Sequence, residues 1–228
     1  MNMRWFWKDL TVFERVLWLV SVGAIASAGA LAGGDPLSVL ASLVGVTSLL
    51  FVAKGYVCGQ ILMVIFSVMY GVISLVFRYY GEMITYLGMT APMAVVTAVS
   101  WYRHPYAGTR EGAVSHLTRR QAVLLSILTA VVTLAGYTLL AALGNAQMLF
   151  STISVATSFI AAALTFCRSP YYALGYAAND VVLVVLWVLA AAADPAYWSM
   201  VICFALFLIN DLYGFVNWRR MQRRQSCS

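Results

Sequence analysis

The sequence predicts an all-α integral membrane protein with eight transmembrane helices. The chain of 228 residues is 63% hydrophobic and 10% charged, about 2.5-fold fewer charges than a soluble domain carries. Its apolar residues gather in segments of the length that crosses a bilayer, about 20 residues each. Its Lys and Arg residues fall almost entirely on one side of the membrane once the chain is threaded through those segments.

The eight apolar segments are joined by short connections. They span residues 16–33, 36–53, 56–77, 83–102, 121–143, 147–167, 171–193 and 196–218. The first segment has a basic start like that of a signal peptide, but no convincing cleavage site follows it. We therefore interpret it as a retained helix. So little chain remains outside the segments that we expect no soluble catalytic domain.

Positive charge in short loops marks the cytoplasmic side of a membrane protein. Of the 14 Lys and Arg residues, all but Arg78 fall on one side, which we predict to be cytoplasmic together with both termini. The residues on that side are Arg4, Lys8, Arg15, Lys54, Arg103, Arg110, Arg119, Arg120, Arg168, Arg219, Arg220, Arg223 and Arg224. The net charge of +6 therefore meets anionic lipid, and no nucleic-acid partner is expected.

The hydrophilic connection 103–120 divides the chain into two halves that resemble each other weakly. Each half runs as three helices with basic residues after the first and the third, and segment 121–143 links the halves. Three helices plus one linker make an even number of crossings, so the two triplets enter the membrane in the same direction, as parallel repeats. Such repeats are a transporter architecture with the substrate site between them near mid-depth.

The predicted organisation is one extra helix followed by a three-plus-one-plus-three (3+1+3) arrangement. The expected units are an N-terminal segment with the extra helix (1–34), a first three-helix repeat (35–102), a cytoplasmic loop and linker helix (103–145), a second three-helix repeat (146–218) and a basic cytoplasmic tail (219–228).

Polar side chains inside a span are costly unless they pair or face a water-filled cavity, so each is a candidate for a functional site. The pattern NDxxxxxxW occurs twice, at residues 179–187 and 210–218. Asp180 and Asp211 are the two acids clearly within the predicted spans. At about 100° per residue, each of them shares a stripe of its helix with the Trp seven residues later.

Two further segments contribute polar side chains at helical spacing. Gln60 and Ser67 lie seven residues apart and share a helix face, as do Thr90 and Thr97. Pro92, between the two threonines, is expected to kink its helix because it cannot donate a backbone hydrogen bond.

Asn210, Gly214 and Asn217 form a second polar stripe on the last segment, suited to line a cleft. Amides bond to hydroxyls and carboxamides, and Trp187 offers a face for stacking or cation–π contact. The inventory suits a neutral or weakly cationic, polyhydroxylated ligand with a planar ring. The alternative is structural, since amides in membrane helices often only bond across helices, at about 0.6–2 kcal/mol each.

Aromatic residues near the segment ends have a simpler interpretation. Trp101 and Trp218 adjoin basic residues and are interpreted as interfacial anchors. Tyr79, Tyr80 and Glu82 fall near the short external connection. They would either gate an entrance or belong to the aromatic belt, and we favour the belt.

Other functional classes find little support in the sequence. The four cysteines show no spacing for a disulfide framework or a zinc site, and no metal or cofactor is expected. His104 and His116 are both in the cytoplasmic loop, and no span holds a Ser–His, HExxH or paired-carboxylate motif, so no catalytic residue is proposed. Lys8 and Lys54, the only lysines, lie at cytoplasmic edges, which disfavours a retinal photoreceptor. A channel is the other alternative, and single-channel currents from reconstituted protein would distinguish such a pore from a carrier.

Three stretches resemble the PnuC family of nicotinamide riboside transporters: 59–92, 171–189 and 204–218, the last two carrying the ND…W motifs. The resemblance implies a 3+1+3 fold like that of a full-length SWEET transporter, with an additional first helix in some members, assembled as a homotrimer in the bacterial cytoplasmic (inner) membrane. It implies facilitated diffusion of nicotinamide riboside for NAD salvage, followed by trapping through cytoplasmic phosphorylation.

The resemblance implies that Gln60, Asn179, Trp187 and Asn210 touch the substrate, and the polar inventory above adds Ser67, Thr90 and Asn217. The expected substrate-binding residues are Gln60, Ser67, Thr90, Asn179, Trp187, Asn210 and Asn217, and the expected structural or gating residues are Asp180, Asp211 and Tyr213. The alternatives are a membrane-embedded enzyme and a carrier of another nucleoside-like vitamin. No buried cluster of Arg or Lys is apparent for a doubly charged phosphate, which disfavours nicotinamide mononucleotide.

Overall fold

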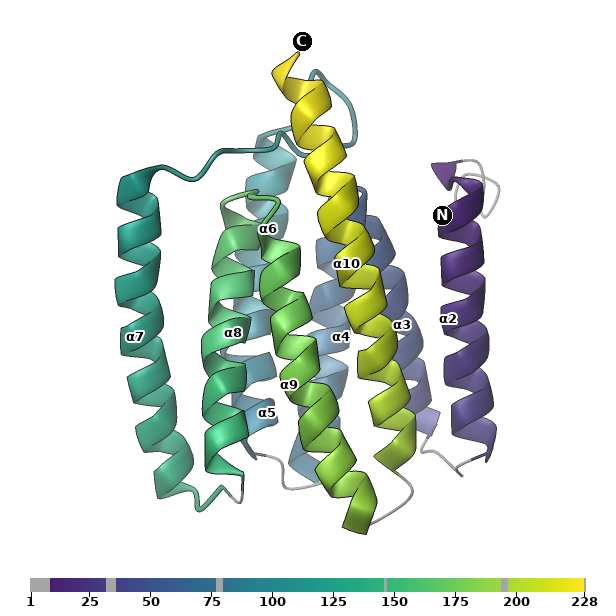
Figure 1. Ribbon diagram of the computed structural model, residues 1–228, viewed down its shortest axis with the longest axis vertical. Coiled ribbons are helices and arrows are strands. Elements are labelled where there is room, and N and C mark those ends of the chain that lie inside the picture. The colour runs from purple at the N-terminus through teal and green to yellow at the C-terminus, as the bar shows by residue number, and fades with distance from the viewer. Residues whose placement is uncertain (1–8, 32–35, 77–79, 146, 194–196, 228) are drawn as a thin grey trace.

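Long apolar segments become helices in a membrane because a helix satisfies its own backbone hydrogen bonds where water is absent. The computed structural model describes residues 9–31, 36–76, 80–145, 147–193 and 197–227. These residues contain eight helices that are long and apolar enough to cross a membrane, standing side by side in one bundle (Figure 1). The predicted all-α fold with eight spans is confirmed. Arg4, Lys8, Arg78 and Tyr79 lie outside the described residues.

Seven of the spans are single helices, and the fourth is composite. The single helices are α2 (Val12–Leu31), α3 (Pro36–Ala53), α4 (Val57–Val76), α7 (Arg119–Ala142), α8 (Met148–Phe166), α9 (Tyr172–Ala193) and α10 (Trp198–Ser226). The fourth span consists of α5 (Tyr80–Met83), the π-helix η1 (Ile84–Thr90) and α6 (Ala91–Arg103). The last helix thus continues through residues that the sequence analysis assigned to a basic tail.

The irregular fourth span reflects Pro92, which lies at the start of α6. The proline ring clashes with the carbonyl group of the residue four positions earlier. The helical turn before Pro92 is wider than a turn of α-helix. There the Ala91 N–H bonds to the Tyr86 carbonyl, five residues back. A π-helical turn therefore precedes Pro92, and Tyr86 and Thr90 both lie in it. The kink expected at Pro92 stays a prediction.

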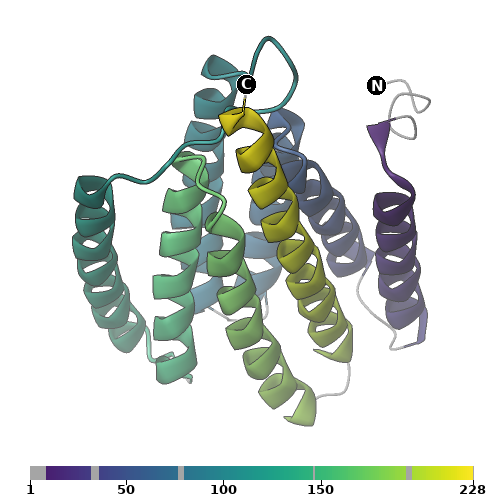
Figure 2. The same cartoon turned by 45° about the horizontal axis from the view of Figure 1, so that its top comes forward.

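The bundle has two peripheral helices at opposite edges, α2 and α7 (Figures 1 and 2). Helix α2 packs against α3 and α10, whereas α7 packs mainly against α8, and Leu140 is the one buried residue of α7. The start of α2 and the end of α10 lie at the same end of the bundle (Figure 1), as an even number of crossings requires. We call this the basic end, because the described Lys and Arg residues lie there.

Two corners at the basic end have the same backbone geometry. Gly55 ends α3 with a φ of 72°, and Arg168 ends α8 with a φ of 55°. The Gly55 N–H donates to the Val52 carbonyl at 2.9 Å, and the Arg168 N–H donates to the Thr165 carbonyl at 3.0 Å. Both corners are left-handed helix ends of the kind that satisfies terminal carbonyl groups.

The loop between α6 and α7 bonds to both corners. The Gly112 N–H donates to the Gly55 carbonyl at 2.9 Å, and the Ser115 N–H donates to the Arg168 carbonyl at 3.0 Å. The last turns of α10 hold the same loop, since the Val114 N–H donates to Gln225 Oε1 at 2.7 Å. The 103–118 loop is therefore an ordered strap that joins the ends of α3, α8 and α10.

Small residues allow α8 and α9 to approach closely. A Cβ atom at Gly175 would lie 2.9 Å from the Cα atom of Ala161, which is backbone and cannot turn aside, whereas a Cβ at Gly23 would meet nothing within 4 Å. Small residues at membrane helix interfaces permit this kind of packing.

We predict that Gly175→Ala destabilises the protein by about 1–3 kcal/mol, because α8 and α9 must separate to admit the methyl group. The matched Gly23→Ala should leave the melting temperature unchanged or slightly higher, since alanine favours the helix. Thermal unfolding in detergent measures both. Equal melting temperatures for the two variants would contradict the close approach of α8 and α9.

Candidate functional site

Helices from both halves of the chain converge on a small cavity in the middle of the bundle. Its volume is about 20 Å³, enough for one water molecule. It is lined by Leu49 of α3, Met63 and Phe66 of α4, Tyr86 and Thr90 of η1, Ser158 of α8, Tyr176, Asn179 and Asp180 of α9, and Phe207 and Asp211 of α10.

Four residues singled out from the sequence meet at this central cavity: Thr90, Asn179, Asp180 and Asp211. All four are buried. The Thr90 hydroxyl donates to the Thr85 carbonyl at 3.1 Å, within the π-helical turn described above. The cavity therefore combines an amide, a hydroxyl and two carboxyl groups in a lipid-shielded interior.

Asn179 is anchored to the neighbouring helix α8. Its Oδ1 accepts hydrogen bonds from the hydroxyl groups of Ser154 at 3.1 Å and Thr157 at 3.0 Å. Two donors on one oxygen fix the orientation of the amide, so its NH₂ group is held in a defined direction.

The two carboxyl groups at the cavity come from neighbouring helices. Asp180 and Asp211 are 4% and 3% exposed, and they lie near enough to interact. Asp180 Oδ2 has no hydrogen-bond partner among the described residues. A buried polar atom without a partner is costly, and such a group beside a cavity favours a role in binding. No Lys or Arg is among the described residues that line the cavity.

On the side away from the basic end, an aromatic layer closes the cavity. Trp187 Nε1 of α9 donates to the Tyr70 hydroxyl of α4 at 3.1 Å, and the rings of Tyr70 and Tyr86 lie 4.4 Å apart. Trp187 is 0% exposed and also contacts Tyr197. In this structure Trp187 thus belongs to the layer that closes the cavity and does not line it.

A second aromatic layer closes the basic end. Trp218 Nε1 of α10 donates to the Val52 carbonyl at the end of α3, at 2.9 Å. Trp101 Nε1 of α6 donates to the Thr165 carbonyl at the end of α8, at 3.0 Å. The two rings lie 5.2 Å apart, and Tyr172 packs against Trp218.

The interpretation of Trp101 and Trp218 as interfacial anchors is wrong, because they are only 1% and 0% exposed. The carbonyl groups that accept from them belong to Thr165 and Val52, respectively. These two residues occupy the same position in the two corners at the basic end, three residues before Arg168 and Gly55. Trp101 of α6 therefore binds the end of α8, and Trp218 of α10 binds the end of α3.

The remaining predicted binding residues, other than Trp187, do not line the cavity. Gln60 and Ser67 are buried on α4, and the Ser67 hydroxyl has no partner among the described residues. Asn210 Nδ2 donates to the Leu206 carbonyl at 2.8 Å and faces Ser21 Oγ of α2 at 3.4 Å. Asn217 Nδ2 donates to the Ala53 carbonyl at 2.8 Å.

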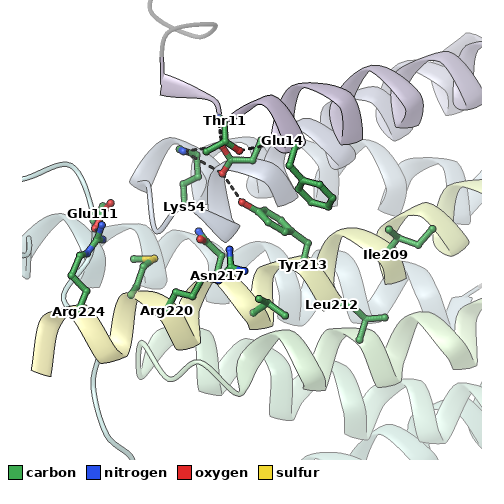
Figure 3. A pocket seen from close by; sticks show the side chains of 13 residues that line it. Thr11, Glu14, Lys54, Glu111, Ile209, Leu212, Tyr213, Asn217, Arg220 and Arg224 are labelled. Carbon is green, nitrogen blue, oxygen red and sulfur yellow. Dashed lines mark hydrogen bonds and ion pairs between the residues drawn. The ribbon is translucent and has the colours of Figure 1, made fainter.

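Glu14, at the start of α2, is a buried acid that was not predicted from the sequence. It is 1% exposed and accepts hydrogen bonds from Tyr213 at 2.7 Å and from Lys54 at 3.2 Å, as Figure 3 shows. Tyr213, predicted as structural or gating, thus ties α10 to α2. A capping box of Thr11 and Glu14 begins the helix, and its T-x-x-E spacing was a usable sequence signal.

Glu82 also departs from its interpretation as part of an external aromatic belt. It is 2% exposed, and neither of its carboxylate oxygens has a hydrogen-bond partner among the described residues. With Glu14, it raises the number of buried acids above the two that the sequence suggested. Glu82 lies at the end of the bundle opposite the basic end, at the start of the composite span.

Two groups in the corners at the basic end have shifted pKa values. Burial lowers the pKa of the Arg168 guanidinium from its ordinary value. Burial and, secondarily, the carboxylate of Asp9 raise the pKa of Tyr56 to about 12. Tyr56 therefore stays neutral near neutral pH.

The central cavity is closed on both sides in this structure. Pockets that hold small organic ligands measure about 300 Å³ or more, far above the 20 Å³ found here. A ligand of that size requires at least one aromatic layer to open.

Comparisons with known proteins agree with this architecture. The sequence profile of a family described as "Nicotinamide mononucleotide transporter" matches residues 35–220. The chain is similar to the nicotinamide riboside transporter PnuC of Neisseria mucosa, at 27% identity over 99% of this chain and 89% of that protein. It is also similar to the crystal structure of the vitamin B3 transporter PnuC, with a TM-score of 0.85 and 25% identity, over 99% of this chain and 100% of the other.

We predict that the Trp187–Tyr70 hydrogen bond contributes about 0.6–1.7 kcal/mol, the range for side-chain bonds between membrane helices. A double-mutant cycle of Trp187→Phe and Tyr70→Phe, followed by thermal unfolding in detergent, measures that coupling. Trp218→Phe combined with Tyr70→Phe is the control, and these two should be additive. Additivity in the Trp187–Tyr70 cycle would contradict the bond.

Proposed function

This chain belongs to the nicotinamide mononucleotide transporter family, and from that membership we propose that it is a transporter of nicotinamide riboside and not an enzyme. The observation that carries the choice of substrate is the central cavity. Two carboxyl groups line it, with no Lys or Arg among its described lining residues. Nicotinamide riboside has a cationic pyridinium ring, a carboxamide and a ribose, and this lining complements all three.

The same observation disfavours the mononucleotide. Its phosphate would lie beside Asp180 and Asp211 in a low-dielectric interior, with no Lys or Arg among the described lining residues to balance its charge. Phosphate sites use Arg, Lys or clustered backbone N–H groups. A neutral or cationic ligand is therefore the better fit.

We assign recognition of the substrate to the residues at the cavity and to those next to it. The fixed amide of Asn179 and the Thr90 hydroxyl suit the carboxamide and the ribose, and Asp180 suits the positive ring. The Ser67 hydroxyl, for which the described part of the chain offers no partner, and Gln60 extend this polar set along α4. Trp187, once released from Tyr70, offers its face to the pyridinium.

Transport by alternating access requires the two aromatic layers to open in turn. The layer of Tyr70, Tyr86 and Trp187, which we call the outer layer, joins α4 to α9 through the Trp187–Tyr70 bond. The layer of Trp101, Trp218 and Tyr172 at the basic end, which we call the inner layer, joins α3 to α10 through Trp218 and α6 to α8 through Trp101. Two parallel three-helix repeats rocking about the cavity would break one set of bonds while keeping the other. The matching geometry of the two corners supports the 3+1+3 arrangement.

Buried acidic residues lie at more than one depth of the bundle, and they favour a cationic substrate along its path through the protein. Glu82 lies at the outer end, and Asp180 and Asp211 lie at the cavity. Transport would then be facilitated diffusion, with the product retained by cytoplasmic phosphorylation.

The assembly and location proposed are a homotrimer in a bacterial inner membrane, with both termini cytoplasmic. The exposed, apolar surface of α7 supports contact with lipid or with neighbouring copies. The clustering of Lys and Arg at the basic end supports the orientation.

The direct test of transport is uptake of radiolabelled nicotinamide riboside into proteoliposomes. We expect uptake to equilibrate without a proton, sodium or ATP supply, because the proposed cycle uses only the substrate gradient. Liposomes without protein are the control. A requirement for an ion gradient to reach equilibration would contradict the uniport mechanism while leaving the substrate assignment intact.

Calorimetry tests the proposed contacts. Nicotinamide riboside should bind wild type, and Trp187→Ala should weaken binding by about 1–3 kcal/mol because an aromatic–cation contact is lost. Trp18→Ala, on the peripheral helix α2, is the matched control and should bind as wild type does. Nicotinamide mononucleotide should bind at least about tenfold more weakly. Tighter binding of the mononucleotide would overturn the choice of substrate.

A further inference from the structure

A large cleft separate from the central cavity lies at the basic end, between α2 and α10. Its volume is about 720 Å³, within the range of about 300–1,000 Å³ for pockets that hold small organic ligands. Figure 3 shows its walls, formed by the start of α2, by Lys54 after α3 and by one face of α10. None of the substrate-binding assignments above except Asn217 touches it.

The wall of the cleft on α10 changes from apolar to basic along its length. Ile209, Leu212 and Val216 are 50%, 47% and 44% exposed, and Arg220 follows on the same face, since residues three, four and seven apart align on a helix. Phe13 of α2, 59% exposed, lies opposite. At about 1.5 Å per residue, the apolar stretch from Ile209 to Val216 is roughly 10 Å long, and Arg220 lies about 6 Å beyond it.

Most of the charges in the cleft neutralise one another. Lys54 pairs with Glu14 at 3.2 Å, and Arg224 pairs with Glu111. Arg220 lines the cleft and is exposed, and it has no ion pair among the described residues. One guanidinium is thus left at the level where an apolar wall ends, and guanidinium groups bind phosphate through two parallel hydrogen bonds.

We propose that this cleft binds an anionic phospholipid of the leaflet on the basic side, with its phosphate on Arg220 and one acyl chain along Ile209, Leu212 and Val216. The charge of Arg220 favours an anionic ligand, because it would repel a cationic substrate. The position of the cleft favours a lipid, because its apolar wall lies on transmembrane helices and continues from the exposed surface of the bundle. Anionic headgroups are enriched where basic residues gather at a membrane surface.

The bound lipid would complete the attachment of the extra helix α2 to the bundle. In the protein itself, this attachment includes the Tyr213–Glu14 bond, the Trp18–Thr47 bond at 3.1 Å and the contact of the Phe13 and Tyr213 rings at 5.2 Å. Phe13, Glu14 and Tyr213 line the cleft, so the lipid would cover their contacts.

Native mass spectrometry of the full-length protein in detergent tests the proposal by titration with phosphatidylglycerol and with phosphatidylcholine of the same acyl chains. Wild type should bind phosphatidylglycerol more tightly. Arg220→Gln should weaken that binding about tenfold, because a charge-assisted hydrogen bond is lost, and should leave phosphatidylcholine unchanged. Arg120→Gln, which removes an exposed arginine at the start of α7, is the matched control and should bind as wild type does.

Leu212→Trp tests the apolar wall independently, because the indole fills the groove and should weaken binding of both lipids. Three results would overturn the proposal: equal binding of the two lipids by wild type, equal losses in Arg220→Gln and Arg120→Gln, or a Leu212→Trp variant that changes the number of subunits and not the lipid bound. The last would make a second copy of the chain the occupant. Nicotinamide riboside binding by each variant reports that it is folded.

Discussion

The hydrogen bonds from Trp101 and Trp218 to the carbonyl groups of Thr165 and Val52 join helices that are far apart in the chain. Inside a membrane, a helix end buried without a partner is costly, because no water replaces the missing bond. The Val52 and Thr165 carbonyl groups each accept one bond within their own corner, and the indole N–H groups supply a second that brings α10 against α3 and α6 against α8. The strap of residues 103–118 and the inner aromatic layer are both built on these two junctions.

The positions and number of the helices could be predicted from the sequence because length, hydropathy and charge bias are properties of each segment alone. The packing of individual side chains could not. Trp101 and Trp218 adjoin basic residues, as interfacial anchors do, and only their bonds to distant carbonyl groups reveal that they are buried. Apolar periodicity gives no help, since lipid-facing and helix-facing surfaces are both apolar.

The candidate site was predictable to a similar degree. Thr90, Asn179, Asp180 and Asp211 meet at the cavity, since polar groups in spans have few places to go other than the bundle interior. Asn210 and Asn217 bond to backbone carbonyl groups, the structural alternative that holds for many membrane amides. Which of the two roles an amide takes depends on its neighbours in space, which a single sequence does not contain.

The pairing of Trp218 with Val52 also bears on how the protein is made. The two residues are 166 positions apart, so α3 enters the bilayer long before the residue that completes its end has been synthesised. Of the two hydrogen bonds that the Val52 carbonyl accepts, only the one from the Gly55 N–H can form before α10 is inserted. Docking of α10 therefore adds a hydrogen bond to the end of α3 well after α3 has been synthesised.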